Sequence, residues 1–92
     1  TNSVTIFPSP FKIPSNKPMV IDGISQNSTI QIMTLSGSKI KTISKKEING
    51  YQTTWNGMND AGVYVESGVY LVLIIDREYN ASSIEKIAVI KN

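Results

Sequence analysis

The stretch Val69-Tyr70-Leu71-Val72-Leu73-Ile74-Ile75 is the longest apolar run in this chain of 92 residues. A continuous apolar segment of this length is typical of a central β-strand that is buried on both faces of its sheet. The run is much shorter than the roughly 20 apolar residues that cross a bilayer as a helix, so the sequence predicts no transmembrane segment. We therefore expect this stretch to lie at the centre of a β-sheet.

The segment after this run continues the strand pattern. Residues Asp76 to Ser82 are polar and predict a hairpin tip, after which Ile84–Ile90 should pair back antiparallel. The apolar side chains of this second strand alternate between its two faces. One face carries Ile87 and Val89, and the other carries Ile84, Ala88 and Ile90.

Period-two alternation also predicts the strands that precede the central one. Gly37 lies between the strands Thr29–Leu35 and Lys39–Ile43 and supplies the positive φ of a tight hairpin loop, so these strands should be antiparallel neighbours. Gly68 should likewise occupy a position where a side chain is costly. Further strands are expected at Val4–Phe7, Met19–Ile21 and Tyr51–Trp55. About seven strands without helical periodicity predict an all-β fold, a small antiparallel β-sandwich formed by one domain of residues 1–92.

Composition excludes several classes of function. Nine Lys and Arg residues against seven Asp and Glu leave a net charge of +2, which is not the strongly basic signature of a nucleic-acid-binding protein. The chain has no cysteine and no histidine, which excludes a disulfide, a thiolate nucleophile, a cysteine-based zinc site and an imidazole base. Its acidic residues are scattered singly. We therefore expect no catalytic residue, no cofactor and no enzymatic activity.

The loop that follows Trp55 is rich in Asn, Asp and Gly. Asn56, Asn59 and Asp60 are spaced loosely like the oxygen ligands of a Ca²⁺ loop. Only one of them is a carboxylate, however, and no Glu follows at the spacing of a terminal bidentate ligand. Side-chain-to-backbone hydrogen bonds that close the loop account for the same residues without an ion. We expect this second arrangement and assign no metal ligand.

The aromatic residues near the centre of the chain allow two interpretations. Tyr51, Trp55 and Tyr70 could form an exposed platform that stacks against a carbohydrate. Large aromatic side chains at strand positions more often lie in the core, with tyrosine hydroxyls reaching the surface. We expect the core arrangement for all three.

The densest basic cluster also allows two interpretations. It consists of Lys39, Lys41, Lys45 and Lys46. These lysines could bind the phosphate or carboxylate groups of an anionic ligand. They could equally protect a solvated edge strand against aggregation, which is the arrangement that we favour.

Several segments together resemble a known family. Phe7-Pro8-Ser9-Pro10-Phe11 resembles the YPNPF opening of the immunoglobulin-like C-terminal domains of Bacteroidetes secreted proteins, with Ser9 in place of Asn and a short polar segment, Lys12–Lys17, after it. Gly37–Ile40 corresponds to the G-x-x-V hairpin of the family, and Trp55–Tyr70 corresponds to its most specific motif. The final strand of the family resembles Lys86–Lys91. The residues that the resemblance implies to be structural are Pro8, Pro10, Gly37, Trp55, Gly57, Gly62, Gly68 and Tyr70.

The resemblance implies both a fold and a function. Domains of this family are similar to the FlgD-type fold, so the β-sandwich is expected to be Ig-like. They are sorting tails of the type IX secretion system, whose outer-membrane machinery takes a protein from the periplasm to the cell surface, usually with transfer to anionic lipopolysaccharide. Ile21–Ile32 is similar to one subset, the PorZ-type, propeller-bearing two-component regulator proteins, whose tails are retained. Because Thr1 is not an initiator methionine, we expect a C-terminal domain excised from a longer protein.

The C-terminal strand is where we expect recognition to occur. The expected recognition element consists of Lys86, Ile87, Val89, Lys91 and Asn92. An edge strand offers free N–H and C=O groups to an incoming strand, while lysines and the chain end add specificity. The type IX machinery is the expected partner, with anionic lipopolysaccharide as a second. Two alternatives stay open: a carbohydrate- or surface-binding module attached to a larger enzyme or receptor, and a structural spacer.

Overall fold

Eight β-strands and one turn of 3₁₀ helix account for the regular structure of residues 4–92, which the computed structural model describes. Residues 1–3 of the predicted domain 1–92 lie outside the described residues. The elements in chain order are β1 (Thr5–Phe7), β2 (Phe11–Ile13), β3 (Met19–Asp22), β4 (Ser28–Thr34), β5 (Lys39–Ile43), η1 (Lys45–Glu47), β6 (Gln52–Trp55), β7 (Gly68–Asp76) and β8 (Ala81–Lys91). Within residues 4–92 no helix is long and apolar enough to cross a membrane.

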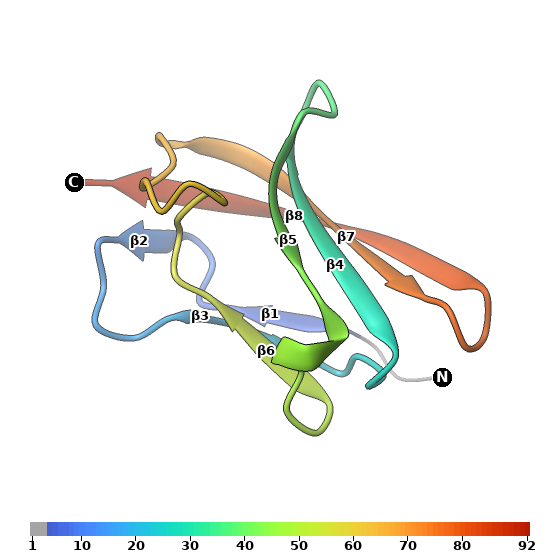
Figure 1. Cartoon of the computed structure of the whole chain (residues 1–92). Helices are drawn as coiled ribbons and strands as arrows, with labels where there is room; N and C mark the ends of the chain where they lie inside the picture. The colour runs from blue at the N-terminus through green and yellow to red at the C-terminus, as the bar shows by residue number, and fades with distance from the viewer. Residues whose placement is uncertain (1–3) are drawn as a thin grey trace.

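The strands form two sheets that pack face to face (Figure 1). The smaller sheet has the order β1-β3-β6, and the larger has the order β2-β8-β7-β4-β5. β7 lies between β8 and β4, and its antiparallel register with β8 runs from Gly68↔Val89 to Asp76↔Ala81. β4 and β5 are antiparallel neighbours, as the hairpin around Gly37 predicted. The all-β sandwich, its central strand and the two predicted hairpins are therefore confirmed.

The core lies between the two sheets and is built by side chains that alternate along each strand. In β4, for example, Ile30 and Ile32 are completely buried, whereas the intervening Gln31 is half-buried on the opposite face. Each buried aliphatic or aromatic side chain contributes roughly 1.5–3 kcal/mol to folding. The buried apolar side chains are Phe11, Ile13, Met19, Ile21, Ile24, Ile30, Ile32, Ile43, Trp55, Val65, Tyr70, Val72, Ile74, Ile87 and Val89.

The central strand differs from its prediction in one respect, because only one of its faces is buried. Tyr70, Val72 and Ile74 face the core and are 7%, 0% and 5% exposed. Leu71 and Leu73, on the opposite face, are only half-buried. The reason is that the smaller sheet covers only one face of the larger sheet. The apolar run of β7, which predicted burial on both faces, therefore has one face near solvent.

A short strand in the proline-rich segment was not predicted. β2 pairs parallel with the end of β8, in the register Phe11↔Val89, Lys12↔Ile90 and Ile13↔Lys91. The prediction of a wholly antiparallel sandwich is therefore wrong in this one pair of strands. The end of β8 also does not lie at the edge of the sheet. Pro8 and Pro10 are exposed in the segment that separates β1 from β2. A strand of three residues is too short to give a period-two signal, and its partner lies at the far end of the chain.

The four glycines of the family motif fall into two groups. Gly37, Gly57 and Gly62 have φ values of 93°, 89° and 81°, a conformation that side chains rarely adopt, so the prediction for Gly37 is confirmed. Gly57 also lies so close to the core that a Cβ there would be 2.7 Å from Cγ2 of Ile13. The prediction for Gly68 is wrong, because its φ is not positive and a Cβ would make only an ordinary contact of 3.9 Å with Tyr70.

The one-sided burial of β7 predicts different responses to the same substitution at adjacent positions. Val72→Asp places a carboxylate in the core and should cost on the order of 4 kcal/mol or more, enough to unfold much of a domain whose stability is roughly 5–15 kcal/mol. Leu71→Asp places the same group on the half-buried face and should cost about 1–2 kcal/mol. Urea unfolding of both variants checks this difference. Equal destabilisation by the two substitutions would contradict the assigned faces.

The close approach of Gly57 to Ile13 predicts a further asymmetry. Gly62→Ala should cost about 1–2 kcal/mol, because only the positive φ opposes the new methyl group and no atom lies within 4 Å of it. Gly57→Ala adds a steric overlap to the same backbone cost and should destabilise the domain by about 2–4 kcal/mol. Thermal unfolding of the two variants measures the difference. If Gly57→Ala were no worse than Gly62→Ala, the packing of the loop on β2 would be wrong.

Candidate functional site

The expected recognition residues divide between the core and the surface. Ile87 and Val89 face the core and are 4% and 2% exposed, so their side chains hold β8 in the sandwich. Lys86, Lys91 and Asn92 are exposed. Only these three side chains of the expected element are accessible to a partner.

The end of β8 is held on both sides. The backbone N–H of Asn92 donates to the carbonyl of Ile13 at 2.9 Å, and the N–H of Lys91 donates to Oγ of Ser67 at 2.8 Å. Nζ of Lys91 also lies 3.1 Å from Oε2 of Glu66, although an ion pair this exposed contributes little to stability. The prediction that this end offers a free strand edge is wrong, because β2 occupies that edge at residues 89–91.

The free edge of β8 lies earlier in the strand. The register with β2 begins at Val89, and no strand of residues 4–92 pairs with β8 on that side before it. Because N–H and C=O groups alternate between the two sides of a strand, the bond from Asn92 to β2 means that even-numbered residues point away from β7. Ser82, Ile84 and Lys86 therefore direct their backbone groups to the free side. We call residues Ser82–Lys86 the open edge.

The other edge of the larger sheet is covered. The loop before β7 bonds to β5 through Asp60, whose N–H donates to the carbonyl of Ile40 at 3.0 Å and whose Oδ1 accepts from the N–H of Thr42 at 3.4 Å. Oδ1 of Asp60 also lies 3.6 Å from Nζ of Lys41. One lysine of the basic cluster thus has a carboxylate partner. These contacts support the interpretation of the cluster as a protected strand edge.

The loop after Trp55 is closed by its own side chains. Oδ1 of Asn56 accepts from the N–H of Met58 at 3.0 Å, and Oδ1 of Asn59 accepts from the N–H groups of Ala61 and Val63 at 2.9 and 3.0 Å. The oxygens that resembled Ca²⁺ ligands therefore bond to the backbone, which supports the second interpretation of this loop.

The three aromatic residues do not form a common surface. Trp55 is 2% exposed and donates from Nε1 to the carbonyl of Met58 at 2.8 Å. Tyr70 is 7% exposed and donates from its hydroxyl to the carbonyl of Glu66 at 2.6 Å. Tyr51 is 67% exposed, so the prediction that it lies in the core is wrong. Because two of the three rings are buried, the proposed carbohydrate-stacking platform is not present in the fold.

Burial also changes the acidity of one of these groups. The pKa of the Tyr70 phenol is raised above its ordinary value of 10.0, first because burial disfavours the phenolate and second because the negative charge of Glu66 lies nearby. The phenol is therefore held in its neutral, hydrogen-bond-donating form.

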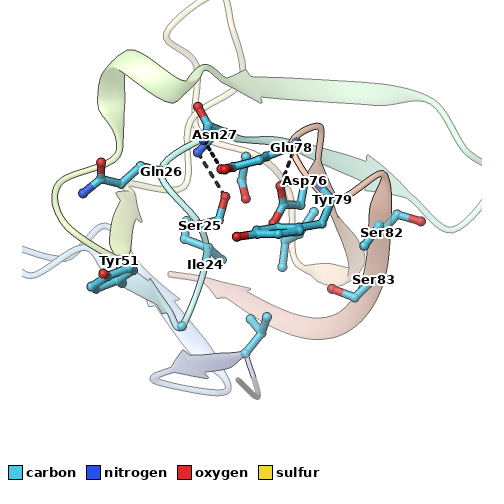
Figure 2. A pocket seen from close by; sticks show the side chains of 15 residues that line it. Ile24, Ser25, Gln26, Asn27, Tyr51, Asp76, Glu78, Tyr79, Ser82 and Ser83 are labelled. Carbon is cyan, nitrogen blue, oxygen red and sulfur yellow. Dashed lines mark hydrogen bonds between the residues drawn. The ribbon is translucent and has the colours of Figure 1, made fainter. Parts of the chain in front are cut away.

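A hollow of about 860 Å³ adjoins the open edge. It lies between the segment that joins β3 to β4 and the β7–β8 hairpin, and Figure 2 shows Tyr51 and Tyr79 on different sides of it. Asn27 donates to Glu78 across its rim, and Oδ1 of Asp76 accepts from the N–H groups of Glu78 and Tyr79. The lining of the hollow includes Ser28, Ile74, Asp76, Glu78, Tyr79, Ser82 and Ser83.

One polar group at this hollow has no partner. Ser28 is 0% exposed, and its Oγ makes no hydrogen bond to any atom of the described residues. A buried hydroxyl without a partner costs free energy, and this one lies behind the wall of the hollow, out of contact with solvent. Sequence reasoning missed the hollow because its walls come from segments far apart in the chain.

Comparisons with known proteins give one informative result. No protein-family model matches the sequence, and no curated protein matches it. Among solved structures, the chain is similar to PorZ of Porphyromonas gingivalis, described as an essential bacterial surface component of the type-IX secretion system. The two share 24% sequence identity with a TM-score of 0.79 over 95% of this chain. The chain spans 11% of the length of PorZ, and at this identity the similarity shows a shared fold.

The raised pKa of Tyr70 predicts a pH dependence that Tyr70→Phe should remove. Below pH 10.0 the variant loses only the hydrogen bond to Glu66, about 1 kcal/mol. The folded-state pKa lies above the unfolded one, so the stability linked to the neutral phenol is complete below pH 10.0 and is lost as the pH rises through the folded pKa. Urea unfolding at about pH 8 and about pH 11 should therefore show a larger loss for the parent chain than for Tyr70→Phe. Identical pH dependence in the two chains would contradict the assignment.

Proposed function

We propose that this chain is a non-catalytic C-terminal domain that sorts or anchors a larger protein at the bacterial cell surface through the type IX secretion system. The observation that carries the proposal is the similarity of nearly the whole chain to part of PorZ, a surface component of that system. The resemblance of the motifs from Phe7 to Lys91 to type IX sorting tails supports the same conclusion independently.

The geometry of the chain end suits a signal that is recognised in the folded state. A secretion machine that accepts many different proteins needs a portable element whose shape does not depend on the protein attached to it. The bonds from Asn92 to Ile13 and from Lys91 to Ser67 fix the end of β8 to the sandwich, which leaves Lys86, Lys91 and Asn92 at the surface in a defined arrangement. Ordering a signal before it binds lowers the entropic cost of recognition.

Charge suggests how partners are distinguished. Lys12 lies opposite Ile90, on the outer face of the sheet that also carries Lys86. Under the proposal, these lysines and Lys91 face acidic surfaces of the secretion machinery, and anionic lipopolysaccharide is a second partner at the cell surface.

The proposal needs no chemistry from the chain itself, and the described residues contain no group of three or more Asp, Glu, His or Cys side chains that could hold a metal.

A transport assay tests the proposal. Residues 1–92 are fused to the C-terminus of a periplasmic reporter and expressed in a bacterium with a type IX system and in its secretion-deficient mutant. We expect protease-accessible reporter at the cell surface of the first strain only. A folded fusion that stays in the periplasm of both strains would contradict the proposal.

Charge reversal shows which lysines the machinery reads. The double variant Lys86→Glu with Lys91→Glu should lower the surface fraction of the reporter several-fold, because it inverts the charge beside the chain end. The matched control reverses Lys45 and Lys46, which are also exposed but lie on η1. An equal loss in both double variants would mean that only net charge matters.

A further inference from the structure

We propose that the open edge of β8, Ser82–Lys86, is a docking site for an extended segment of a partner polypeptide. The segment would join the larger sheet as an additional strand beside β8 and place one of its side chains at the hollow. This inference rests on the proposed function only in taking the partner to be a protein of the secretion machinery. The docking geometry itself follows from the fold.

The open edge has the hydrogen-bonding groups that strand addition requires. Ser82, Ile84 and Lys86 together present three N–H and three C=O groups on the side away from β7. The same side of the same strand already binds β2 through residues 89–91, with the N–H of Asn92 bonded to Ile13 at 2.9 Å. β8 is therefore regular enough on this side to pair with another strand. The pairing with β2 begins at Val89 and leaves the residues before it free.

The open edge carries one exposed lysine, Lys86, at its end but is otherwise less protected than the other long edge of the sheet. Free strand edges promote association, and native proteins cover them or place prolines and lysines along them. β5 is covered by the loop around Asp60 and carries Lys39 and Lys41. The open edge has no such cover within residues 4–92, and its central residue, Ile84, is 58% exposed. Free backbone groups on one side and an accessible aliphatic side chain at the centre are together what strand addition uses.

The hollow supplies selectivity for the side chains of the added strand. Ser82 and Ser83 line it, so the beginning of the open edge forms one of its walls. A side chain that points from the added strand toward the core would lie beside Ser83, within the hollow. In strand addition, backbone bonds supply affinity and pockets for alternate side chains supply specificity.

The lining of the hollow defines the chemistry of that side chain. Asp76 and Glu78 disfavour an acidic group, while the half-buried Ser83 offers a hydroxyl for hydrogen bonding. The outward-facing side chains would instead pack on Ile84, which is 58% exposed on the neighbouring strand. The segment that fits is therefore a strand with aliphatic residues outward and hydroxyl-bearing residues inward.

Nuclear magnetic resonance of the labelled chain tests the proposal with a defined probe. The probe is a synthetic heptapeptide with blocked ends in which valine alternates with threonine. We expect it to shift the amide signals of Ser82, Ile84 and Lys86 and to slow their hydrogen exchange. Two control peptides should bind at least roughly tenfold more weakly: one methylated at alternate amide nitrogens, which cannot complete the backbone bonds, and one with glutamate in place of threonine.

Substitutions of the chain give the second arm of the test. Ile84→Pro removes the backbone N–H that points to the free side of β8, away from β7. Ile84→Lys keeps this N–H but places a charge at the centre of the open edge. Both should weaken peptide binding at least roughly tenfold. If the proline variant fails to fold, the lysine variant decides alone. Val63→Lys is the matched control, because Val63 is 59% exposed and lies in the loop before β7.

Four outcomes would overturn the inference. They are no shift at the open edge at millimolar peptide, equal binding of the methylated peptide, equal binding by Ile84→Lys, and protection of the same amides by self-association without peptide. None of them depends on transport, so a failed peptide experiment with a successful fusion would remove this docking site and leave the proposed function in place.

Discussion

The packing of Trp55 against Phe11 connects the two sheets at the end of the sandwich where the chain terminates. The ring centroids are 6.1 Å apart, and the indole N–H is bonded to the carbonyl of Met58 in the loop that follows. This contact holds β2 in place, and β2 in turn occupies the edge of β8 as far as Val89. Gly57 allows the same loop to approach Ile13 closely. The position of the final residues thus depends on an aromatic contact near the middle of the chain.

Much of the fold could be predicted because side-chain alternation records which face of a strand is buried. This pattern placed Ile87 and Val89 together on one face of their strand, and both are buried. The pattern failed for Leu71 and Leu73, because an uninterrupted apolar run does not reveal that only one layer covers the sheet. It also failed for β2, whose three residues are paired with a strand almost the whole chain away.

The candidate site was less predictable than the fold for a related reason. The open edge is the part of β8 that has no neighbouring strand on one side. Its extent depends on where β2 pairs with β8, and β2 was not predicted. The hollow is formed by segments as distant as Ser28 and Ser83, and sequence patterns report only on neighbours along the chain. Tyr51 illustrates the same limit, since its aromatic character indicated burial while the turn before β6 leaves it 67% exposed.

The parallel pairing of β2 with the end of β8 has a consequence for biosynthesis. Phe11 and Ile13 leave the ribosome well before residues 89–91, which form their strand partner. Until then these two large side chains have no sheet to join, and the smaller and larger sheets cannot be closed at that end. A nascent or prematurely ended chain therefore exposes apolar surface that a finished one conceals. A copy that ends before residues 89–91 cannot complete the domain, and the apolar surface that it exposes would favour its removal by proteolytic quality control.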